Sequence, residues 1–270
     1  MNLDKIKAKL ANIEAKNNSK SKTIWKPSPG KQEVRIVPYK GDKDYPFLEL
    51  YFHYDFGGRT IISPISFGNP DPIQKLSDQL RSTGDKEDWN LSRKIAPKLR
   101  IYVPILVRGK EEEGVKYWGF GNQIYEELLK YIDDPDYGDI SDLKNGTDIV
   151  VEYTAAAGPG SFPKTAIRMR KNTSVVSADK AVIKLLDEMP LTSEMWPEPT
   201  YAELEKLLQA FIENSDAEEE ETAGEIDDDD DDSTVGVEDD IFPEAKGNGK
   251  KLAGKNVKAD VDEAFDEMFK

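Results

Sequence analysis

The fold is decided by two stretches of this 270-residue chain, KLRIYVPILV at residues 98–107 and VKYWGF at residues 115–120. Both are rich in β-branched and aromatic residues, which favour strands. The turn EEEG at residues 111–114 lies between them, so the two stretches predict a β-hairpin. Pro104 inside the first stretch suggests an edge strand or a bulge, because proline has no N–H to donate.

Further segments extend this hairpin into a larger sheet. Alternating segments predict strands, and segments with apolar residues every three or four positions predict helices. The combination of short strands, a few helices and long loops predicts a β-rich α+β fold, namely an OB-fold-like small barrel elaborated by helices, whose open face would bind extended strands. The predicted strands are 33–37, 47–56, 59–63, 144–154 and 165–171, and the predicted helices are 122–132, 178–189 and 200–213.

The two ends of the chain carry opposite charge. Residues 1–37 hold nine Lys or Arg against three acids, whereas residues 213–244 hold 17 acids and no base, including the six aspartates Asp227–Asp232. Phosphates attract Lys and Arg, and a run of carboxylates competes for the same cations. This layout points to nucleic acid. The body between the ends is not globally basic, so an anion site there must be a local groove.

Several function classes fit the composition poorly. The chain has no cysteine and one histidine, His53, which leaves no thiolate metal ligands and no firm His-based catalytic triad. The sequence GPGS at residues 158–161 lacks the Lys-Ser/Thr of a phosphate-binding loop. No segment reaches the roughly 20 apolar residues of a membrane span. We therefore expect a protein that is not an enzyme, has no membrane partner and suits a reducing, cytoplasmic setting.

Composition divides the chain into four parts: a basic arm (1–23), a core (24–213), a disordered acidic tail (214–259) and a short amphipathic segment (260–270). The arm has an apolar stripe, which fits a helix docked on the core or an arm that packs on another copy or on phosphates. The last segment predicts a partner-docking site, and the alternative is a tail that only solubilises. Its docking residues would be Phe265, Met268 and Phe269.

Aromatic and basic side chains are interleaved on the predicted strands. Bases stack on flat side chains and Arg or Lys follow the phosphates, which is what sequence-tolerant binding of single strands requires. The alternative is that aromatic residues at alternate strand positions belong to the core. The expected nucleic-acid-binding residues are Tyr51, His53, Arg59, Arg100, Tyr102, Lys116, Trp118, Phe120, Arg168 and Arg170.

Taken in order, several landmarks resemble a known family. They are Trp25-Lys26, the stretch VRIVP at residues 34–38, and the hairpin at residues 100–121 that runs into a helix. Over residues 24–177 the chain resembles the single-stranded DNA-binding (helix-destabilising) proteins of T-even-type tailed bacteriophages. The resemblance implies an OB-fold core, a tail that recruits replication and recombination proteins, and action in the cytoplasm of an infected bacterium. It also implies cooperative self-association through the arm, here with Lys5, Lys7, Lys9, Lys20 and Lys22.

One departure from the family concerns a metal. Members typically carry a structural zinc held by Cys and His after the first hairpin, but residues 64–73 here contain neither. We therefore expect no zinc and no other cofactor, with the prolines and Phe67 of this loop taking the role of a brace.

The sequence thus predicts a protein that coats and protects single-stranded DNA, almost without regard to sequence, in phage DNA replication, recombination and repair. Two alternatives stay open. An acidic-tailed scaffold or chaperone would bind basic proteins and leave tryptophan fluorescence unchanged by oligo-dT. An RNA-binding OB module would prefer oligo-U to oligo-dT, although no residue visibly reads a 2′-hydroxyl.

Overall fold

The computed structural model describes residues 23–54, 56, 59–158 and 160–218. Within them the chain forms two compact units: unit 1 comprises residues 23–49 and 100–197, and unit 2 comprises residues 50–99 and 198–218. The predicted boundaries of the four parts stay a prediction. Several predicted site residues lie outside the described ranges, namely Lys5, Lys7, Lys9, Lys20, Lys22, Phe265, Met268 and Phe269, as does the acidic tail beyond residue 218.

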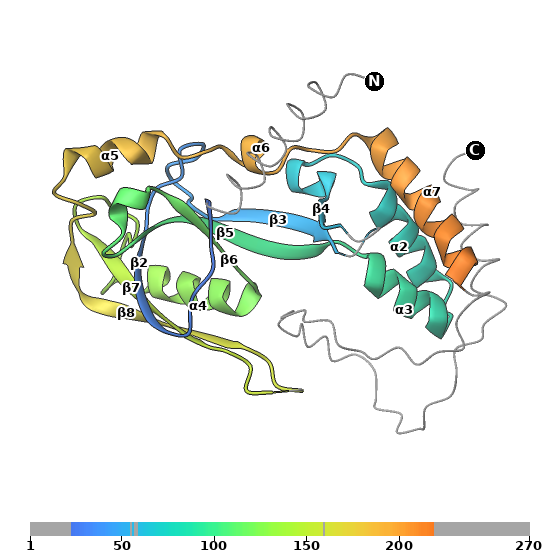
Figure 1. Cartoon of the computed structure of the whole chain (residues 1–270), viewed down its shortest axis with the longest axis horizontal. Coiled ribbons are helices and arrows are strands. Elements are labelled where there is room, and N and C mark those ends of the chain that lie inside the picture. The colour runs from blue at the N-terminus through green and yellow to red at the C-terminus, as the bar shows by residue number, and fades with distance from the viewer. Residues whose placement is uncertain (1–22, 55, 57–58, 159, 219–270) are drawn as a thin grey trace, which may run out of the picture. The chain divides into compact units, whose positions relative to one another are not determined.

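The described residues form one mixed sheet of eight strands, and six of these strands lie wholly or mostly in unit 1 (Figure 1). The main path runs β1-β6-β5-β2-β7-β8, where β1 pairs with β6 in parallel and the other neighbours are antiparallel. The strands are β1 Ile24–Trp25, β2 Gly30–Ile36, β3 Leu48–His53, β4 Ile61–Ile62, β5 Lys98–Val107, β6 Lys116–Phe120, β7 Gly146–Thr154 and β8 Lys164–Ser174.

This arrangement confirms the mixed α+β class but not the closed barrel. The path has two ends, β1 and β8, so the sheet of the described residues is not closed on itself. The prediction for Pro104 is also wrong, because β5 has neighbours on both sides. The proline is accommodated because β2 ends at Ile36. The carbonyl oxygen of Pro104 accepts from the N–H of Val37 at 3.0 Å, just past that end. The nitrogen of Pro104, which has no hydrogen to donate, therefore faces the chain beyond the last paired residue of β2.

The register of β5 and β6 divides the sheet of unit 1 into two faces. Residues directly opposite each other on an antiparallel ladder share a face. Val103 lies opposite Trp118, and Tyr102 lies opposite Gly119. The inner face, defined here by Val103 and its neighbours, is apolar and buried; it carries Val34, Ile36, Ile101, Val103, Ile105, Trp118, Phe120, Ile149, Val151, Ile167 and Met169.

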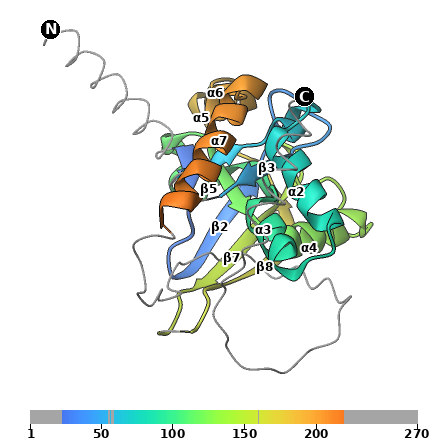
Figure 2. The same ribbon diagram turned by 90° about the vertical axis from the view of Figure 1, so that its right-hand side faces the viewer.

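Three helices complete unit 1: α4 Asn122–Asp133, α5 Lys180–Asp187 and α6 Thr192–Met195. Helix α4 contacts β8, the last strand of the main path. Helices α5 and α6 belong to a second apolar cluster, which packs on Leu106 and Tyr117 of the other, outer face. In both ribbon views, α5 and α6 lie on the opposite side of the strands from α4 (Figures 1 and 2). The outer face is therefore only partly covered.

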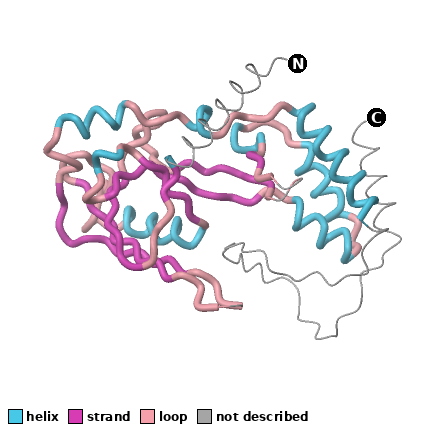
Figure 3. Tube along the Cα trace, in the orientation of Figure 1, coloured by secondary structure: helices cyan, strands magenta, loops and turns pink. Residues whose placement is uncertain are grey.

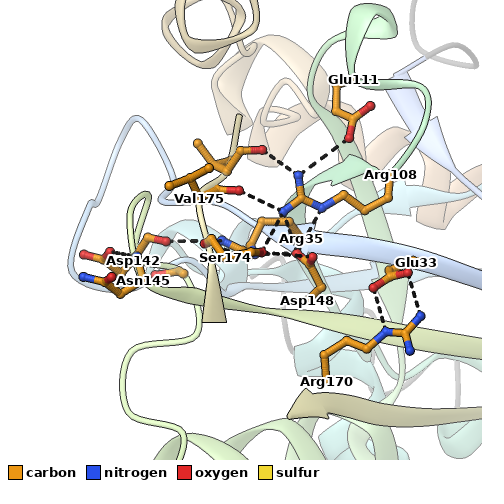
Figure 4. A network of polar contacts seen from close by, with 12 residues as sticks. Glu33, Arg35, Arg108, Glu111, Asp142, Asn145, Asp148, Arg170, Ser174 and Val175 are labelled. Atoms are coloured by element: carbon orange, nitrogen blue, oxygen red, sulfur yellow. Dashed lines mark hydrogen bonds and ion pairs between the residues drawn. The ribbon is translucent and has the colours of Figure 1, made fainter. Parts of the chain in front are cut away.

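A buried polar network joins the strands of unit 1 on the outer face (Figure 4). Asp148 Oδ1 accepts from Nε of Arg35 at 2.8 Å and from Nη2 of Arg108 at 2.7 Å. Both guanidinium groups also donate to Ser174, Arg35 through Nη1 and Nη2 to its carbonyl at 3.1 Å. Burial lowers the pKa of Arg35, the nearby charge of Arg108 acts in the same direction, and Asp148 opposes both. One carboxylate thus neutralises a fully buried cation, Arg35, and a half-buried one, Arg108.

Unit 2 is built from β4, part of β3 and three helices: α2 Pro72–Ser82, α3 Lys86–Ile95 and α7 Tyr201–Glu218 (Figure 3). Their apolar cluster includes Ile73, Leu80 and Leu204. Phe56 stacks on Phe211 with ring centroids 4.7 Å apart. Helix α2 begins at a proline after the N-cap Asp71, and α3 begins after the N-cap Asp85. Proline and aspartate are favoured at these positions because they suit the unpaired N–H groups of a first turn.

The carboxylate of Asp71 has four hydrogen-bond partners within unit 2. Its Oδ1 accepts from the backbone N–H groups of Ile73 at 2.8 Å and Gln74 at 3.2 Å, and its Oδ2 accepts from the Ser63 hydroxyl and lies 2.8 Å from Nε2 of His53. Nδ1 of His53 donates to the carbonyl of Ile95 at 2.8 Å. One carboxylate therefore ties together β3, the segment after β4, the start of α2 and the end of α3.

These residues do not fit the zinc site that the family resemblance implies. The chain has no cysteine, and both ring nitrogens of His53 already have partners. Among the described residues, no three His, Cys, Asp or Glu side chains form a group that could hold a metal ion. In the loop expected to act as a brace, Pro64 and Pro72 are buried and Phe67 is half-buried. The hydrogen bonds of Asp71 join this loop to β3 and to the start of α2.

Candidate nucleic-acid interface

Three of the predicted binding residues are buried, which corrects their assignment. Trp118 is 1% exposed and Phe120 is 4% exposed, and both point to the inner face. The Trp118 ring meets Trp25 edge to face at 5.7 Å and Phe120 at 4.7 Å. His53 is fully buried and bonded to Asp71. These side chains belong to the core and cannot stack on a base in this structure.

Two predicted cations are engaged with carboxylates. Lys116 lies 3.5 Å from Glu113, and its side chain is only 15% exposed. Arg170, on β8, donates to both oxygens of Glu33 at 2.7 and 2.9 Å (Figure 4). The hydrogen bonds and charge of Glu33 raise the pKa of Arg170. A phosphate could reach the exposed Arg170 only in competition with this bidentate pair, since such pairs are among the stronger polar contacts.

Arg100 and Tyr102 lie together on the outer face of β5. Both are half-buried, and they are two positions apart on one strand. Nη2 of Arg100 donates to the carbonyl of Gly119 at 3.2 Å. The Tyr102 ring lies over Gly119: a Cβ at that glycine would come within 2.6 Å of the ring. Glycine on β6 thus lets the tyrosine lie flat against the sheet.

Trp196, which the sequence argument missed, completes this surface. Its ring centroid lies 4.5 Å from that of Tyr102, with the planes tilted by 47°. Trp196 follows directly after α6 and is half-buried, as Tyr102 is. Two partly exposed rings next to a guanidinium group are the components that base stacking and phosphate binding require. We call Arg100, Tyr102, Gly119 and Trp196 the aromatic platform.

Strand β8 adds cations to the same face. The register places Arg168 opposite Val150, and Val150 opposite Glu33, on the outer face with Tyr102. Arg168, Lys164 and Lys171 are exposed and form no ion pair with any described carboxylate. β8 and β5 are separated by two strands, and Arg168 is level with Arg108, six residues along β5 from Tyr102, so Arg168 lies roughly 25 Å from Tyr102 along the sheet. These cations could follow a strand that crosses the sheet.

The hairpin between β7 and β8 presents a second aromatic residue that sequence reasoning missed. Phe162 is 71% exposed, the most exposed large hydrophobic residue among those described. It lies in the uncharged segment AAAGPGSFP at residues 155–163, at the end of the long hairpin that extends from the strands of unit 1 (Figure 1). The sequence did contain a signal for this exposed residue, namely a single aromatic residue in a Gly- and Pro-rich loop between two strands.

The remaining predicted residues, Tyr51 and Arg59, belong to unit 2. Tyr51 is half-buried on β3, and its backbone N–H donates to the hydroxyl of Ser66 at 2.8 Å. Arg59 is exposed. Both have the exposure that a contact with nucleic acid would need, and their role stays a prediction.

A further aromatic cluster in unit 1 is acidic and suits phosphate poorly. The hydroxyl groups of Tyr45 and Tyr125 both donate to Oε1 of Glu49, at 2.9 and 2.7 Å, and their two oxygens lie in direct contact. Phe47 meets both rings edge to face. Burial, together with the neighbouring Glu49, raises the pKa of both tyrosines, so both stay protonated donors. The cluster ties α4 to the start of β3.

Comparison with known families gives one match. The model of a family described as "gp32 DNA binding protein like" matches residues 28–221, which include unit 2, unit 1 apart from its first described residues, and every residue of the aromatic platform. No curated protein matches the chain at a significant level. In the described part of the chain, none of the helices has the length and apolar character needed to cross a bilayer.

Proposed function

This chain belongs to the gp32-like family of DNA-binding proteins, and from that premise we propose that it coats single-stranded DNA with little regard to sequence. The family match confirms the resemblance found in the sequence. The proposal assigns the contact with bases to the aromatic platform and the contact with phosphates to Arg100 and to the exposed cations of β8.

The strand order supports an OB-fold-like core for this role. In chain order β2, β5, β6, β7 and β8 are five strands, and β2 is central, pairing with both β5 and β7. An OB-fold is a five-stranded, partly open barrel that binds ligands on its second and third strands and on the loop between its fourth and fifth. On this numbering β5 and β6 carry the platform, and the β7–β8 loop carries Phe162.

The observation that carries the proposal is the Tyr102–Trp196 pair beside Arg100. Both rings keep part of their surface in solvent, whereas buried aromatic pairs such as Trp118 and Phe120 do not. A duplex hides the faces of its bases, so a surface that stacks on them selects unpaired strands.

Tyr102→Ala is expected to weaken binding to oligo-dT by about 5- to 150-fold, because one stacked base contributes about 1–3 kcal/mol. Fluorescence anisotropy with a labelled oligonucleotide at one fixed salt concentration measures this. Tyr137→Ala is the matched control: Tyr137 is a half-buried tyrosine of unit 1 that meets another ring, Tyr131, at 5.3 Å, away from the platform. Unchanged affinity in a folded Tyr102→Ala protein would remove the platform from the interface.

Oligo-dT is expected to quench tryptophan fluorescence mainly through Trp196. Trp196→Phe should therefore remove most of the quenching, whereas Trp118→Phe should keep it, because Trp118 is buried. Fluorescence titration of the two variants and the unchanged protein measures the difference. Loss of quenching in Trp118→Phe alone would place the contact elsewhere. Absence of quenching in every protein, with binding only to basic proteins, would favour a scaffold instead.

The finer parts of the proposal come from the charged ends and from the family. Residues 1–37 are basic and residues 213–244 are acidic, a layout that suits cooperative self-association through the arm and recruitment of replication and recombination proteins by the tail. Such a protein would act in DNA replication, recombination and repair of a phage, inside its bacterial host. Competition between oligo-dT and oligo-U distinguishes this role from that of an RNA-binding module.

A further inference from the structure

A groove of about 550 Å³ lies on unit 1, at the far end of the β5–β6 hairpin from the aromatic platform's Gly119. Its apolar lining comes from Val175 and from the edges of Val176 and Val182, which are buried, and its charged lining includes Glu111, Glu112 and Asp179. Val175 is 53% exposed, which is unusual for a valine beside a buried core. We call this the acidic groove.

The acidic groove carries net negative charge. Arg108 also lines it, but this guanidinium is already compensated: it bonds to Asp148 and lies 3.6 Å from Glu111. Its Nη1 further donates to the carbonyl of Val176 at 2.6 Å. Glu112 and Asp179 are exposed. A ligand for this groove should therefore combine apolar side chains with positive charge.

The first residues of the chain have that chemistry. Leu3, Ile6, Leu10 and Ile13 recur every three or four positions, and Lys5, Lys7, Lys9 and Lys16 lie between them. This pattern predicts a basic amphipathic helix, which binds apolar grooves through one face. The other terminal segment, with Phe265, Met268 and Phe269, lies among acids and would be repelled.

The first described strand, β1, shows on which side of the sheet the arm joins the fold. β1 runs parallel to β6, with Ile24 opposite Tyr117, so the chain before Ile24 leaves toward the residues before Tyr117. Glu111 is six residues before Tyr117, at most about 20–22 Å along the chain. Residues 17–23 between the apolar stripe and β1 can span roughly 23–25 Å. The arm is therefore long enough to reach the groove of its own chain.

We propose that residues 2–16 of the arm dock in the acidic groove of the same chain, with apolar residues on the valines and lysines beside Glu111, Glu112 and Asp179. Docking would hold the lysines of the arm away from DNA phosphates and from other copies of the protein. Occupancy within one chain is favoured over a second copy because a short tether gives an effective concentration in the millimolar range.

Disulfide trapping tests this directly, because the chain has no cysteine of its own. Val175→Cys is combined with Leu10→Cys in one full-length protein and with Ile6→Cys in another. Val175 is exposed, so its replacement leaves the core intact. Under mild oxidation, at least one protein is expected to form an intramolecular disulfide that is seen on a non-reducing gel at monomer size, at a rate independent of protein concentration.

The control pairs Leu10→Cys with Gln123→Cys, an exposed position on α4 away from the groove.

Adding Glu111→Gln and Glu112→Lys to the trapping proteins should slow cross-linking by about threefold or more, since each exposed ion pair contributes up to about 1 kcal/mol. A cross-linked dimer would assign the groove to a second copy. No disulfide in either protein, or equal yield with Gln123→Cys, would also overturn the proposal. The test contains no DNA, so its outcome is separate from that of the proposed function.

Discussion

Asp148→Ala is expected to lower the free energy of unfolding by about 3–5 kcal/mol, the usual effect of removing one partner from a buried charge network. Asp148 Oδ1 is shared by Arg35, which is fully buried, and Arg108. Without the carboxylate, two guanidinium groups would face each other inside unit 1. Urea denaturation followed by circular dichroism measures the change.

The matched control for this prediction lies four residues further along β7, on the same face. Glu152 pairs with Lys31 at 3.5 Å, but the two side chains are 53% and 64% exposed. Exposed pairs contribute about 0–1 kcal/mol, so Glu152→Ala should change stability little. Equal losses in the two variants would show that the network around Asp148 adds nothing beyond a surface ion pair.

Asp71→Ala is expected to destabilise unit 2 by about 3–5 kcal/mol, because it removes the partner of a buried His53 and of a buried Ser63 together with an N-cap. Denaturation followed by fluorescence of Trp89, on α3, measures the loss in this unit. Asp85→Ala removes the exposed N-cap of α3 and should cost only about 0.5–2 kcal/mol. A loss no larger than that of Asp85→Ala would mean that the bonds to His53 and Ser63 do not stabilise the fold.

The loss of stability in acid gives a second test of the role of Asp71. Burial raises the pKa of Asp71, but hydrogen bonds from His53 and Ser63 and the charge of His53 outweigh it, and the pKa of Asp71 is lowered overall. A lowered carboxyl pKa stabilises the folded state above the unfolded value and ceases to do so as the pH falls through the folded value. From about pH 4 downward, the unchanged protein should therefore lose stability more steeply than Asp71→Ala.

The two strands of the central hairpin could be predicted from the sequence. Which side chains of one strand share a face with which side chains of the other could not. Residues 98–107 and the end at residue 120 agree with β5 and β6 because β-branched and aromatic residues run through both. Alternation within each strand also holds. The register between the two strands depends on the length of the turn that joins them, and a short 3₁₀ helix at Glu111–Glu113 sets that length. For that reason Tyr102 and Trp118 lie on opposite faces, although each alternates as expected.

Two helices of unit 2 were not predicted, although the sequence contains their signals. Asp71 before Pro72, then Ile73, Leu76 and Leu80, is an N-cap followed by helical spacing. The prolines of the segment instead suggested a loop in the place of the family's zinc site. His53 could not be recognised as buried, because its partner Asp71 is 18 residues away in the sequence and is brought to it only by the fold.

The candidate site was predicted in part. Arg100 and Tyr102 have the expected strand, face and exposure, because a two-residue period within one strand needs no long-range information. Trp196 could not be connected to them, since it meets Tyr102 from a segment more than 90 residues later. Phe162 was visible as a single aromatic residue in an uncharged loop, but only the structure shows how much of it is exposed.

The contact between the Tyr102 ring and Gly119 makes the two positions dependent on each other. Any side chain at position 119 would collide with the ring in its present position, so it should favour a smaller residue at position 102. In a library randomised at both positions and selected for a folded protein, tyrosine at 102 should thus be recovered mainly together with glycine at 119. Surviving sequences would reveal this linkage by covariation, with no need of a ligand.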